Sequence, residues 1–296
     1  MKSQTKKLHE QLPDTCPDNF CLAPFISTRQ NEAGMTSPCA FGAGEWNLSE
    51  HSKEDRWNHS SVNNLRAKFI RGERPSECFR CHAEEDAGKP SLRQRQFEYF
   101  PDAYENFVKT GDWLKGPKTG VFKTSNICNL ACRSCGGWDT SLYKDEGVFY
   151  RDTYQTTDAK HPELGLHNRF IPPRDPRHME FASFADISDN FEKLDFFGGE
   201  PLVNTTHLDL LEHMIASGKS QECTLYYSTN VVQFPHKRLL DAWQNFKRVE
   251  LSLSIDGLGN KFEYTRWPAK WSKVERNVER FMELHQLYPD VEWDIQ

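Results

Sequence analysis

The sequence lacks long hydrophobic runs and an excess of positive charge. No stretch approaches the roughly 18 uninterrupted apolar residues of a membrane-spanning helix, and the polar segment 1–10 lacks the apolar core of a signal peptide. The formal net charge of −6 at pH 7 gives no broad basic surface for binding phosphates. We therefore expect a cytoplasmic protein with neither a membrane nor a nucleic acid as its partner.

The composition is that of a folded globular protein. Hydrophobic residues make up 37% of the chain and charged residues 27%, a balance far from that of disordered chains. A length of 296 residues is enough for two domains. Because Lys115-Gly116-Pro117 interrupts the chain, we expect a module of residues 1–115 followed by a domain of residues 116–296.

The second domain alternates short apolar segments with amphipathic ones. Strands are predicted at 120–124, 193–197, 224–228, 249–255 and 291–295. Helices are predicted at 207–216, 238–246 and 274–285, where apolar residues recur every three or four positions. This alternation predicts an α/β fold in which crossover helices cover a parallel sheet. The long segment 136–190 is interpreted as a helix with an inserted lid or substrate loop.

The first module has short apolar runs among Asn, Ser, Arg and Gly residues. We expect it to be small, cysteine-rich and loop-rich, with helices near 65–71 and 99–110, each followed by a glycine.

The nine cysteines of the chain are more than packing requires, and a reducing compartment argues against disulfides. Cys128, Cys132 and Cys135 follow the first predicted strand at the spacing C-x3-C-x2-C. Three thiolates can hold three corners of a [4Fe–4S] cluster and leave the fourth iron open to a ligand. Structural zinc and buried reduced thiols are alternatives, although no fourth ligand follows at the spacing that zinc sites use.

This cysteine motif resembles that of the radical S-adenosylmethionine (SAM) superfamily. The resemblance implies a partial (β/α) TIM-like barrel, of which about five of the six strands are present. It also implies that SAM binds the open iron and is reductively cleaved to a 5′-deoxyadenosyl radical, which abstracts hydrogen from the substrate. An electron donor such as flavodoxin or ferredoxin is then a partner. Because the chain ends on its fifth predicted strand, we expect a fragment of a longer protein; completion of the sheet by a partner chain is the alternative.

Three later segments lie at predicted strand ends, where this superfamily binds SAM. They are Gly198-Gly199-Glu200, Ser228-Thr229-Asn230, and Ser254 with Asp256 in the segment 254–257. The resemblance implies that Glu200 binds the amino group of SAM and that Arg266 binds its carboxylate. Ordinary turns, helix caps or a surface arginine are the alternatives. Ser134 stands where an aromatic residue often helps to seat adenine, and Trp138 is the candidate substitute.

Cys21, Cys39, Cys78 and Cys81 resemble the ligands of SPASM/twitch modules, which hold auxiliary clusters. The resemblance implies a second [4Fe–4S] cluster, and four-thiolate ligation favours electron transfer over substrate binding. Tetrahedral zinc is the main alternative. The segment 78–82 also matches the haem-attachment pattern of c-type cytochromes, which the missing export signal disfavours. Cys16 is a fifth ligand, a spare or a replacement for Cys21, and Cys223 is expected to be a buried thiol.

The predicted function is radical chemistry on a peptide or protein, because SPASM and twitch relatives often perform it. One alternative is a radical SAM enzyme that acts on a small molecule such as a sugar, a nucleotide or an amino-acid derivative. Another is a non-catalytic iron–sulfur or zinc metalloprotein.

Overall fold

The computed structural model describes residues 2–31, 35–39, 46–47, 52–136, 139–143, 179, 181 and 184–296. The chain divides into two compact units. The first comprises Met1–Gln30, Gly34–Val121 and Ser183–Lys193, and the second comprises Asn31–Ala33, Phe122–Ala182 and Leu194–Gln296. The chain passes from the first unit to the second between residues 121 and 122, inside a strand and six residues after the predicted boundary. The later segment Ser183–Lys193 also belongs to the first unit.

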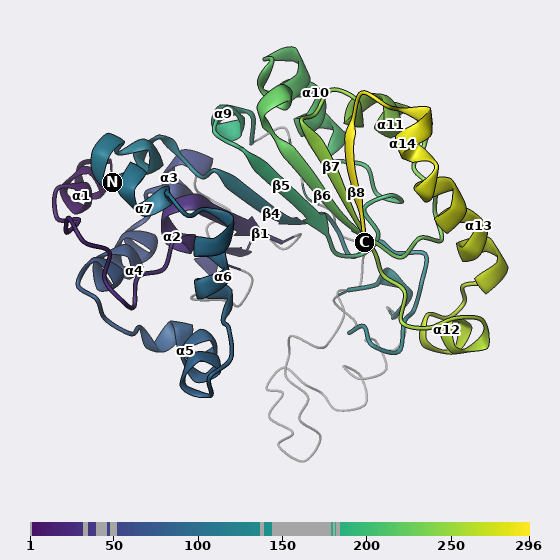
Figure 1. Ribbon diagram of the computed structural model, residues 1–296, viewed down its shortest axis with the longest axis horizontal. Coiled ribbons are helices and arrows are strands. Elements are labelled where there is room, and N and C mark those ends of the chain that lie inside the picture. The colour runs from purple at the N-terminus through teal and green to yellow at the C-terminus, as the bar shows by residue number, and fades with distance from the viewer. Residues whose placement is uncertain are drawn as a thin grey trace. The chain divides into compact units, whose positions relative to one another are not determined.

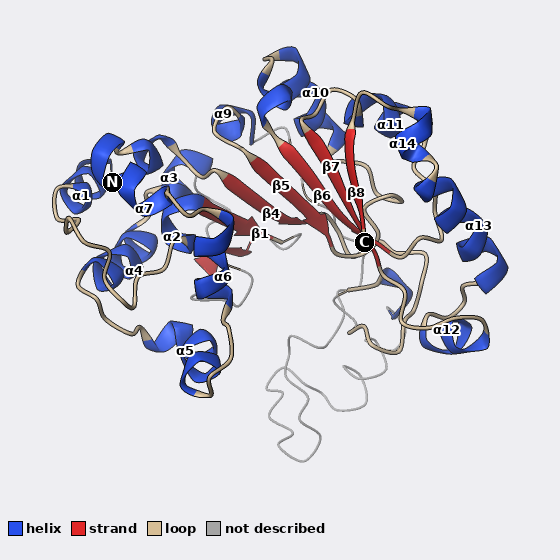
Figure 2. Ribbon diagram, viewed as in Figure 1, coloured by secondary structure: helices blue, strands red, loops and turns tan. Residues whose placement is uncertain are grey.

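The first unit is mainly helical in its described part. Its helices are α1 (Lys2–His9), α2 (Ala23–Ile26), α3 (Lys53–Trp57), α4 (Ser60–Ile70), α5 (Phe79–Asp86), α6 (Leu92–Tyr99), α7 (Ala103–Thr110) and α9 (Ala185–Ser188). Three short antiparallel strands accompany them: β1 (Ser27–Gln30), β2 (Met35–Ser37) and β3 (Trp46–Asn47). Figure 2 shows how helices dominate this unit.

The described part of this module is more helical than the sequence predicted, because local caps and packing stabilise short helices of modest propensity. The Ser91 side chain accepts a hydrogen bond from the Gln94 backbone N–H, and the Gln94 side chain binds the Ser91 N–H in return. This capping box starts α6. Helix α7 ends at Gly111, whose φ of 62° suits a glycine.

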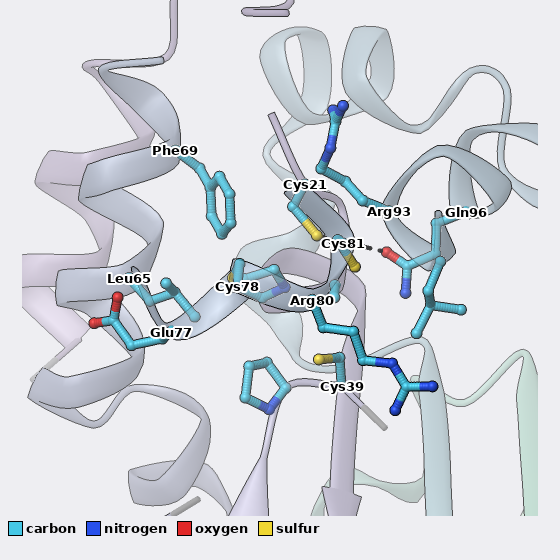
Figure 3. A pocket seen from close by; sticks show the side chains of 14 residues that line it. Cys21, Cys39, Leu65, Phe69, Glu77, Cys78, Arg80, Cys81, Arg93 and Gln96 are labelled. Carbon is cyan, nitrogen blue, oxygen red and sulfur yellow. Dashed lines mark hydrogen bonds between the residues drawn. The ribbon is translucent and has the colours of Figure 1, made fainter. Parts of the chain in front are cut away.

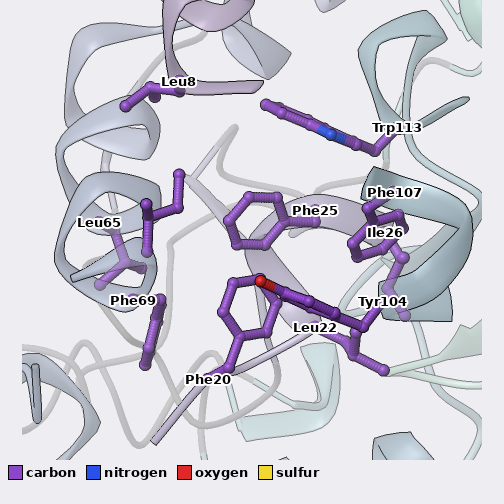
Figure 4. Packing of buried hydrophobic residues seen from close by; sticks show 11 residues of the cluster. Leu8, Phe20, Leu22, Phe25, Ile26, Leu65, Phe69, Tyr104, Phe107 and Trp113 are labelled. Carbon is purple, nitrogen blue, oxygen red and sulfur yellow. The ribbon is translucent and has the colours of Figure 1, made fainter. Parts of the chain in front are cut away.

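An aromatic cluster forms the core of the first unit (Figure 4). The Phe25 ring lies 4.8 Å from the Phe20 ring and 5.1 Å from the Trp113 ring, measured between centroids. Burying each such side chain contributes about 1.5–3 kcal/mol. Arg66 is also buried here, and its Nε donates a hydrogen bond to the Pro24 carbonyl at 2.7 Å. Desolvation lowers the pKa of Arg66 to about 9.

The second unit carries the five predicted strands, all of which are present. They are β4 (Thr119–Lys123), which spans the change between units, β5 (Lys193–Phe197), β6 (Thr224–Thr229), β7 (Arg248–Leu253) and β8 (Glu292–Ile295). They lie in the order β4-β5-β6-β7-β8. Strands β6, β7 and β8 run parallel, with Ser228 opposite Ser252 and Val249 opposite Trp293. The described strands form an open, mostly parallel sheet.

Helices follow these strands along the chain: α10 (Leu208–Ala216), α11 (Lys237–Trp243), α12 (Asn260–Thr265), α13 (Trp271–Met282) and α14 (Leu284–Leu287). Figure 1 shows α10, α11 and α13 alongside strands β5–β8. The predicted α/β fold is thus confirmed. No helix in the described ranges is both long and apolar enough to cross a membrane.

Buried aromatic side chains join the sheet to its helices. The Tyr227 ring on β6 lies 5.1 Å from the Phe196 ring on β5 and 4.9 Å from the Trp243 ring on α11. Because Leu225, Tyr227 and Thr229 alternate with less buried residues, one face of β6 packs against the helices. The predicted lid falls mostly on residues outside the described ranges.

Candidate metal centres

The first candidate centre is the loop that follows β4 and carries Cys128, Cys132 and Cys135. The Cys128 sulfur accepts hydrogen bonds from the Leu130 N–H at 3.4 Å and from the Asn230 side-chain amide at 3.6 Å. The Cys135 N–H donates to the Cys132 carbonyl at 3.0 Å. The loop therefore folds back on itself and brings two of its thiols into contact.

The three thiols have different electrostatic surroundings. Burial raises the pKa of Cys128 to about 11. A hydrogen bond from Cys135, together with the positive charge of Arg266, lowers the pKa of Cys132. The same Cys132–Cys135 hydrogen bond and burial raise the pKa of Cys135. Metal binding requires the thiolate form, so ligation would release protons from Cys128 and Cys135.

Backbone hydrogen bonds hold this cysteine loop from two sides. The Ala131 N–H donates to the Trp267 carbonyl at 2.7 Å, and the Arg133 N–H donates to the Thr265 carbonyl at 2.9 Å. On the other side, the Tyr143 hydroxyl donates to the Cys132 carbonyl at 2.9 Å. We call residues 265–267 the strap. Because the strap and Tyr143 bind backbone atoms, they position the loop without using its thiols.

The turn after β5 contacts the same loop. Gly199 has a φ of 55°, and a Cβ at this position would collide with the Ile127 carbonyl. The next residue, Glu200, donates its N–H to that carbonyl at 2.9 Å. Glycine at position 199 is therefore required by both backbone conformation and space.

Gly199→Ala is expected to destabilise the protein by about 3 kcal/mol or more, because the Ile127 carbonyl must move and its hydrogen bond is lost. Gly218→Ala is the matched control: its φ is 75°, and its Cβ would meet no described atom within 4 Å. This control should lose only about 1 kcal/mol. Urea unfolding of both variants measures the difference. Equal losses would contradict the close approach at Gly199.

Glu200 is a buried carboxylate beside the cysteine loop, with 1% of its surface exposed. Its oxygens accept hydrogen bonds from the Leu202 N–H, the Thr229 hydroxyl and the Asn230 N–H at 3.1, 2.8 and 2.7 Å. All three donors are neutral. Burial raises the pKa of Glu200 to about 7 despite these hydrogen bonds. A cation placed next to this carboxylate would favour its charged form.

The other predicted SAM contacts lie at the ends of β6 and β7 and in the strap. The Ser228 and Ser254 hydroxyl oxygens are 3.5 Å apart. Arg266 Nε lies 2.8 Å from Asp256 Oδ2. The charge of Arg266 also acts on Glu200 and partly opposes the rise in the pKa of Glu200 that burial causes. The candidate residues of three separate segments thus gather at one edge of the sheet.

Asn230 links this edge to the cysteine loop directly. Its side-chain amide donates to Asn129 Oδ1 at 2.8 Å as well as to the Cys128 sulfur. Ser134 is exposed, and the proposed substitute for its missing aromatic ring, Trp138, lies outside the described residues.

Sequence reasoning missed an ion pair at this site. Lys123 Nζ lies 3.0 Å from Asp139 Oδ1, and Asp139 Oδ2 accepts the Gly136 N–H at 3.2 Å. The pair ties the end of β4 to the residues just after Cys135. The available signal was a lysine next to Val121 and Phe122 in the predicted strand 120–124, where a charge is unusual unless it is paired.

The second candidate centre is a pocket in the first unit (Figure 3). Cys21, Cys39, Cys78 and Cys81 all line it. They come from four places in the chain: before α2, after β2, in the short 3₁₀ helix Ser76–Cys78, and in α5. The four cysteines predicted as one ligand set therefore surround a common space.

Polar groups also line this pocket. The Cys21 thiol donates to Gln96 Oε1 at 3.9 Å. Burial, with added repulsion from Cys39, raises the pKa of Cys21 and raises that of Cys78 to about 12. Arg93 binds Glu85 at 2.7 Å and interacts electrostatically with Cys21 and Cys81. A cation beside four thiols could stabilise an anionic, thiolate-ligated group.

The remaining cysteines lie elsewhere. Among the described residues, Cys21 lines the pocket and Cys16 does not. Cys16 is half-buried and packs against the core of the first unit. Cys223 is fully buried, as predicted. Within the described ranges, no three or more His, Cys, Asp or Glu side chains are grouped so as to hold a single metal ion.

A scan against protein-family models matches no family, and searches of curated proteins and of solved structures find no match. The case for the function of this chain therefore rests on two groups of residues: the three-cysteine loop with the polar strand ends around it, and the pocket lined by four cysteines.

Proposed function

We propose that this chain is a radical SAM enzyme in which Cys128, Cys132 and Cys135 hold the catalytic [4Fe–4S] cluster. One observation carries the proposal: segments far apart in the sequence meet at the cysteine loop. Asn230 contacts Cys128 across 102 residues of sequence, and Glu200 binds the carbonyl of Ile127. A purely structural metal loop would not need a buried carboxylate and a guanidinium close enough to act on its thiols, as Glu200 acts on Cys128 and Arg266 on Cys132.

The same proposal makes the open sheet a partial (β/α) barrel. The cysteine loop follows β4, and the candidate SAM contacts lie at or just after the carboxyl ends of β5, β6 and β7. Barrel enzymes assemble their sites at the carboxyl ends of their strands. This agreement in place supports a common site, with the Ser254 and Asp256 segment completing it.

When bound, the cluster supplies the electron that cleaves a carbon–sulfur bond of SAM. The residues of the chain bind and orient the ligands. The buried carboxylate of Glu200 accepts the ammonium group of SAM, which stabilises the charged form of both groups. Arg266 binds the carboxylate of SAM through its guanidinium, and this contact replaces part of its contact with Asp256. Asn230 orients the Cys128 thiolate by donating its amide hydrogen.

Two further parts of the proposal come from the resemblance to SPASM/twitch proteins. One is that the hydrogen donor is a peptide or protein. The other is that Cys21, Cys39, Cys78 and Cys81 hold an auxiliary [4Fe–4S] cluster, which four thiolates would adapt to electron transfer. The pocket lined by all four cysteines supports the second part.

The assigned SAM contacts can be tested by replacing Glu200 and Arg266. Glu200→Gln and Arg266→Gln are expected to weaken SAM binding about 30-fold or more, because each removes one partner of a largely buried charge pair. Calorimetric titration of the reconstituted protein with SAM measures the affinity, and formation of 5′-deoxyadenosine measures cleavage.

Arg276→Gln is the control, because this arginine on α13 is exposed. It should leave both quantities unchanged. Iron content and visible absorption must match those of the unmodified protein in every variant. Unchanged SAM affinity and cleavage in both site variants would contradict the assignment of these contacts.

A further inference from the structure

Helix α13 buries an asparagine on its apolar face. Its buried residues are Val274, Asn277 and Phe281, which recur every three or four positions. A buried amide costs free energy unless it is hydrogen-bonded. The Asn277 side-chain amide donates to the Val231 carbonyl at 2.8 Å and to the Val232 carbonyl at 3.1 Å. Asn277 therefore holds residues 230–232, which we call the β6 turn.

The backbone of the β6 turn is strained. Val231 has a φ of 67°, a left-handed conformation that is unfavourable for a β-branched residue. The residue is also fully buried, so its carbonyl needs a donor from the protein, and Asn277 supplies one. Strain of this kind persists only where the surrounding structure enforces it. The contact with α13 is therefore what keeps the β6 turn in its conformation.

The β6 turn in its turn orients the Asn230 side chain. The Val232 N–H donates to Asn230 Oδ1 at 3.0 Å. The other end of the same amide, Nδ2, then faces the cysteine loop and donates to the Cys128 sulfur at 3.6 Å. A chain of hydrogen bonds thus runs from Asn277 on α13, through the β6 turn, to the first cysteine of the loop.

We propose that Asn277 is a positioning residue that raises the reduction potential of the cluster at Cys128 by holding the β6 turn. This inference rests on the proposed radical SAM function. Hydrogen bonds to the cysteine sulfurs help to set the potential of an iron–sulfur cluster. A donor beside the sulfur stabilises the negative charge that the cluster gains on reduction, so the Asn230 amide raises the potential. Without Asn277 the β6 turn relaxes, the amide leaves the sulfur and the potential falls.

Asn277→Ala is expected to lower the ratio of reduced to oxidised cluster about 5-fold at the midpoint potential of the unmodified protein, the effect of losing one ordinary hydrogen bond. Titration with dithionite, followed by electron paramagnetic resonance, measures this ratio on the signal that the Cys128/Cys132/Cys135 triple variant lacks. Asn230→Ala should produce the same shift. Because Asn277 acts through Asn230, the double variant Asn230→Ala/Asn277→Ala should shift no further.

A second substitution at Val231 separates positioning from a structural role. Glycine adopts the φ of Val231 without strain, so the β6 turn should keep its conformation without the donor on α13. Asn277→Ala/Val231→Gly should therefore regain the potential of the unmodified protein. Lost stability alone would not be recovered by truncating a further buried side chain.

The matched control is Asn245→Ala, which also removes an amide that donates to a backbone carbonyl, that of Asp241 at 2.9 Å. Asn245 precedes β7, so it lies at the opposite end of that strand from the cysteine loop. This control should leave the potential unchanged.

Hydrogen exchange gives a second readout, on the cluster-free protein. The backbone N–H groups of the β6 turn should exchange about 10-fold or more faster in Asn277→Ala, because local opening becomes easier. Asn245→Ala should not change their exchange. Asn277→Ser keeps one donor and should show a smaller change of the same sign in both readouts, and it takes the place of the alanine variant if that variant does not fold.

The outcomes separate this inference from the function on which it rests. Faster exchange with an unchanged potential would make Asn277 a purely structural residue and would overturn the inference. Unchanged exchange in Asn277→Ala, or additive shifts of the potential in the double variant, would overturn it as well. Absence of an iron–sulfur cluster at Cys128 in the unmodified protein would instead contradict the radical SAM function, and the exchange experiment would still show whether Asn277 holds the β6 turn.

Discussion

Replacing Cys128, Cys132 and Cys135 together by alanine is expected to remove about four irons per chain and to abolish 5′-deoxyadenosine formation from SAM. The effect is large because no partial ligand set remains on the loop. The fold should survive, since the loop is held by backbone bonds to Thr265 and Trp267. Iron and sulfide counts after anaerobic reconstitution, together with circular dichroism, measure both expectations.

Cys223→Ala is the control for this experiment. It removes a fully buried thiol from the same unit, and this thiol contacts the Thr224 carbonyl at 3.6 Å. The control should keep its iron and its SAM cleavage while losing a little stability, as expected when a small buried side chain is truncated. A triple variant that still cleaves SAM would show that the reaction does not depend on this loop.

The double variant Cys78→Ala/Cys81→Ala is expected to lose the other half of the iron, about four atoms per chain, and to keep the cluster at Cys128. Its first unit should also be destabilised by several kcal/mol, because metal ligation ties together three segments that are far apart in the sequence, around Cys21, Cys39 and Cys78–Cys81. Urea unfolding with and without reconstitution should show that bound metal stabilises the unmodified protein more than the variant.

Cys16→Ala is the matched control, since this thiol packs against the same core without lining the pocket that the described residues define. It should keep all of its iron. If the unmodified protein instead binds one zinc and about four irons, and the double variant loses only the zinc, the auxiliary site is a structural zinc site. Loss of iron in the Cys16 variant would contradict the assigned ligand set.

The strands could be predicted from the sequence because apolar runs with clear ends define them. The segment 193–197 is bounded by Gly198-Gly199, and the structure has β5 over the same residues. The helices of the first unit were harder. Helix α5 has two buried residues among its eight, Cys81 and His82, so its sequence carries little apolar periodicity. Its position depends on packing within the unit, which a local pattern does not record.

The candidate site was predictable in outline and not in detail. Strand ends indicated where Glu200 and Asn230 would lie, because parallel strands bring their carboxyl ends to one edge. The contact between Asn230 and Cys128 joins residues 102 positions apart, and no local pattern predicts such a pairing. The burial of Glu200 and the Lys123–Asp139 pair likewise depend on tertiary packing. For the same reason the left-handed backbone of Val231 became apparent only in the structure.

The most direct test of the central claim is a single assay on the unmodified protein. The chain is reconstituted anaerobically with iron and sulfide, its metals are counted, and it is incubated with SAM and dithionite. We predict about eight irons per chain and the release of 5′-deoxyadenosine. Tightly bound zinc at both cysteine sites, with SAM recovered intact, would contradict radical SAM chemistry and would identify a structural metalloprotein.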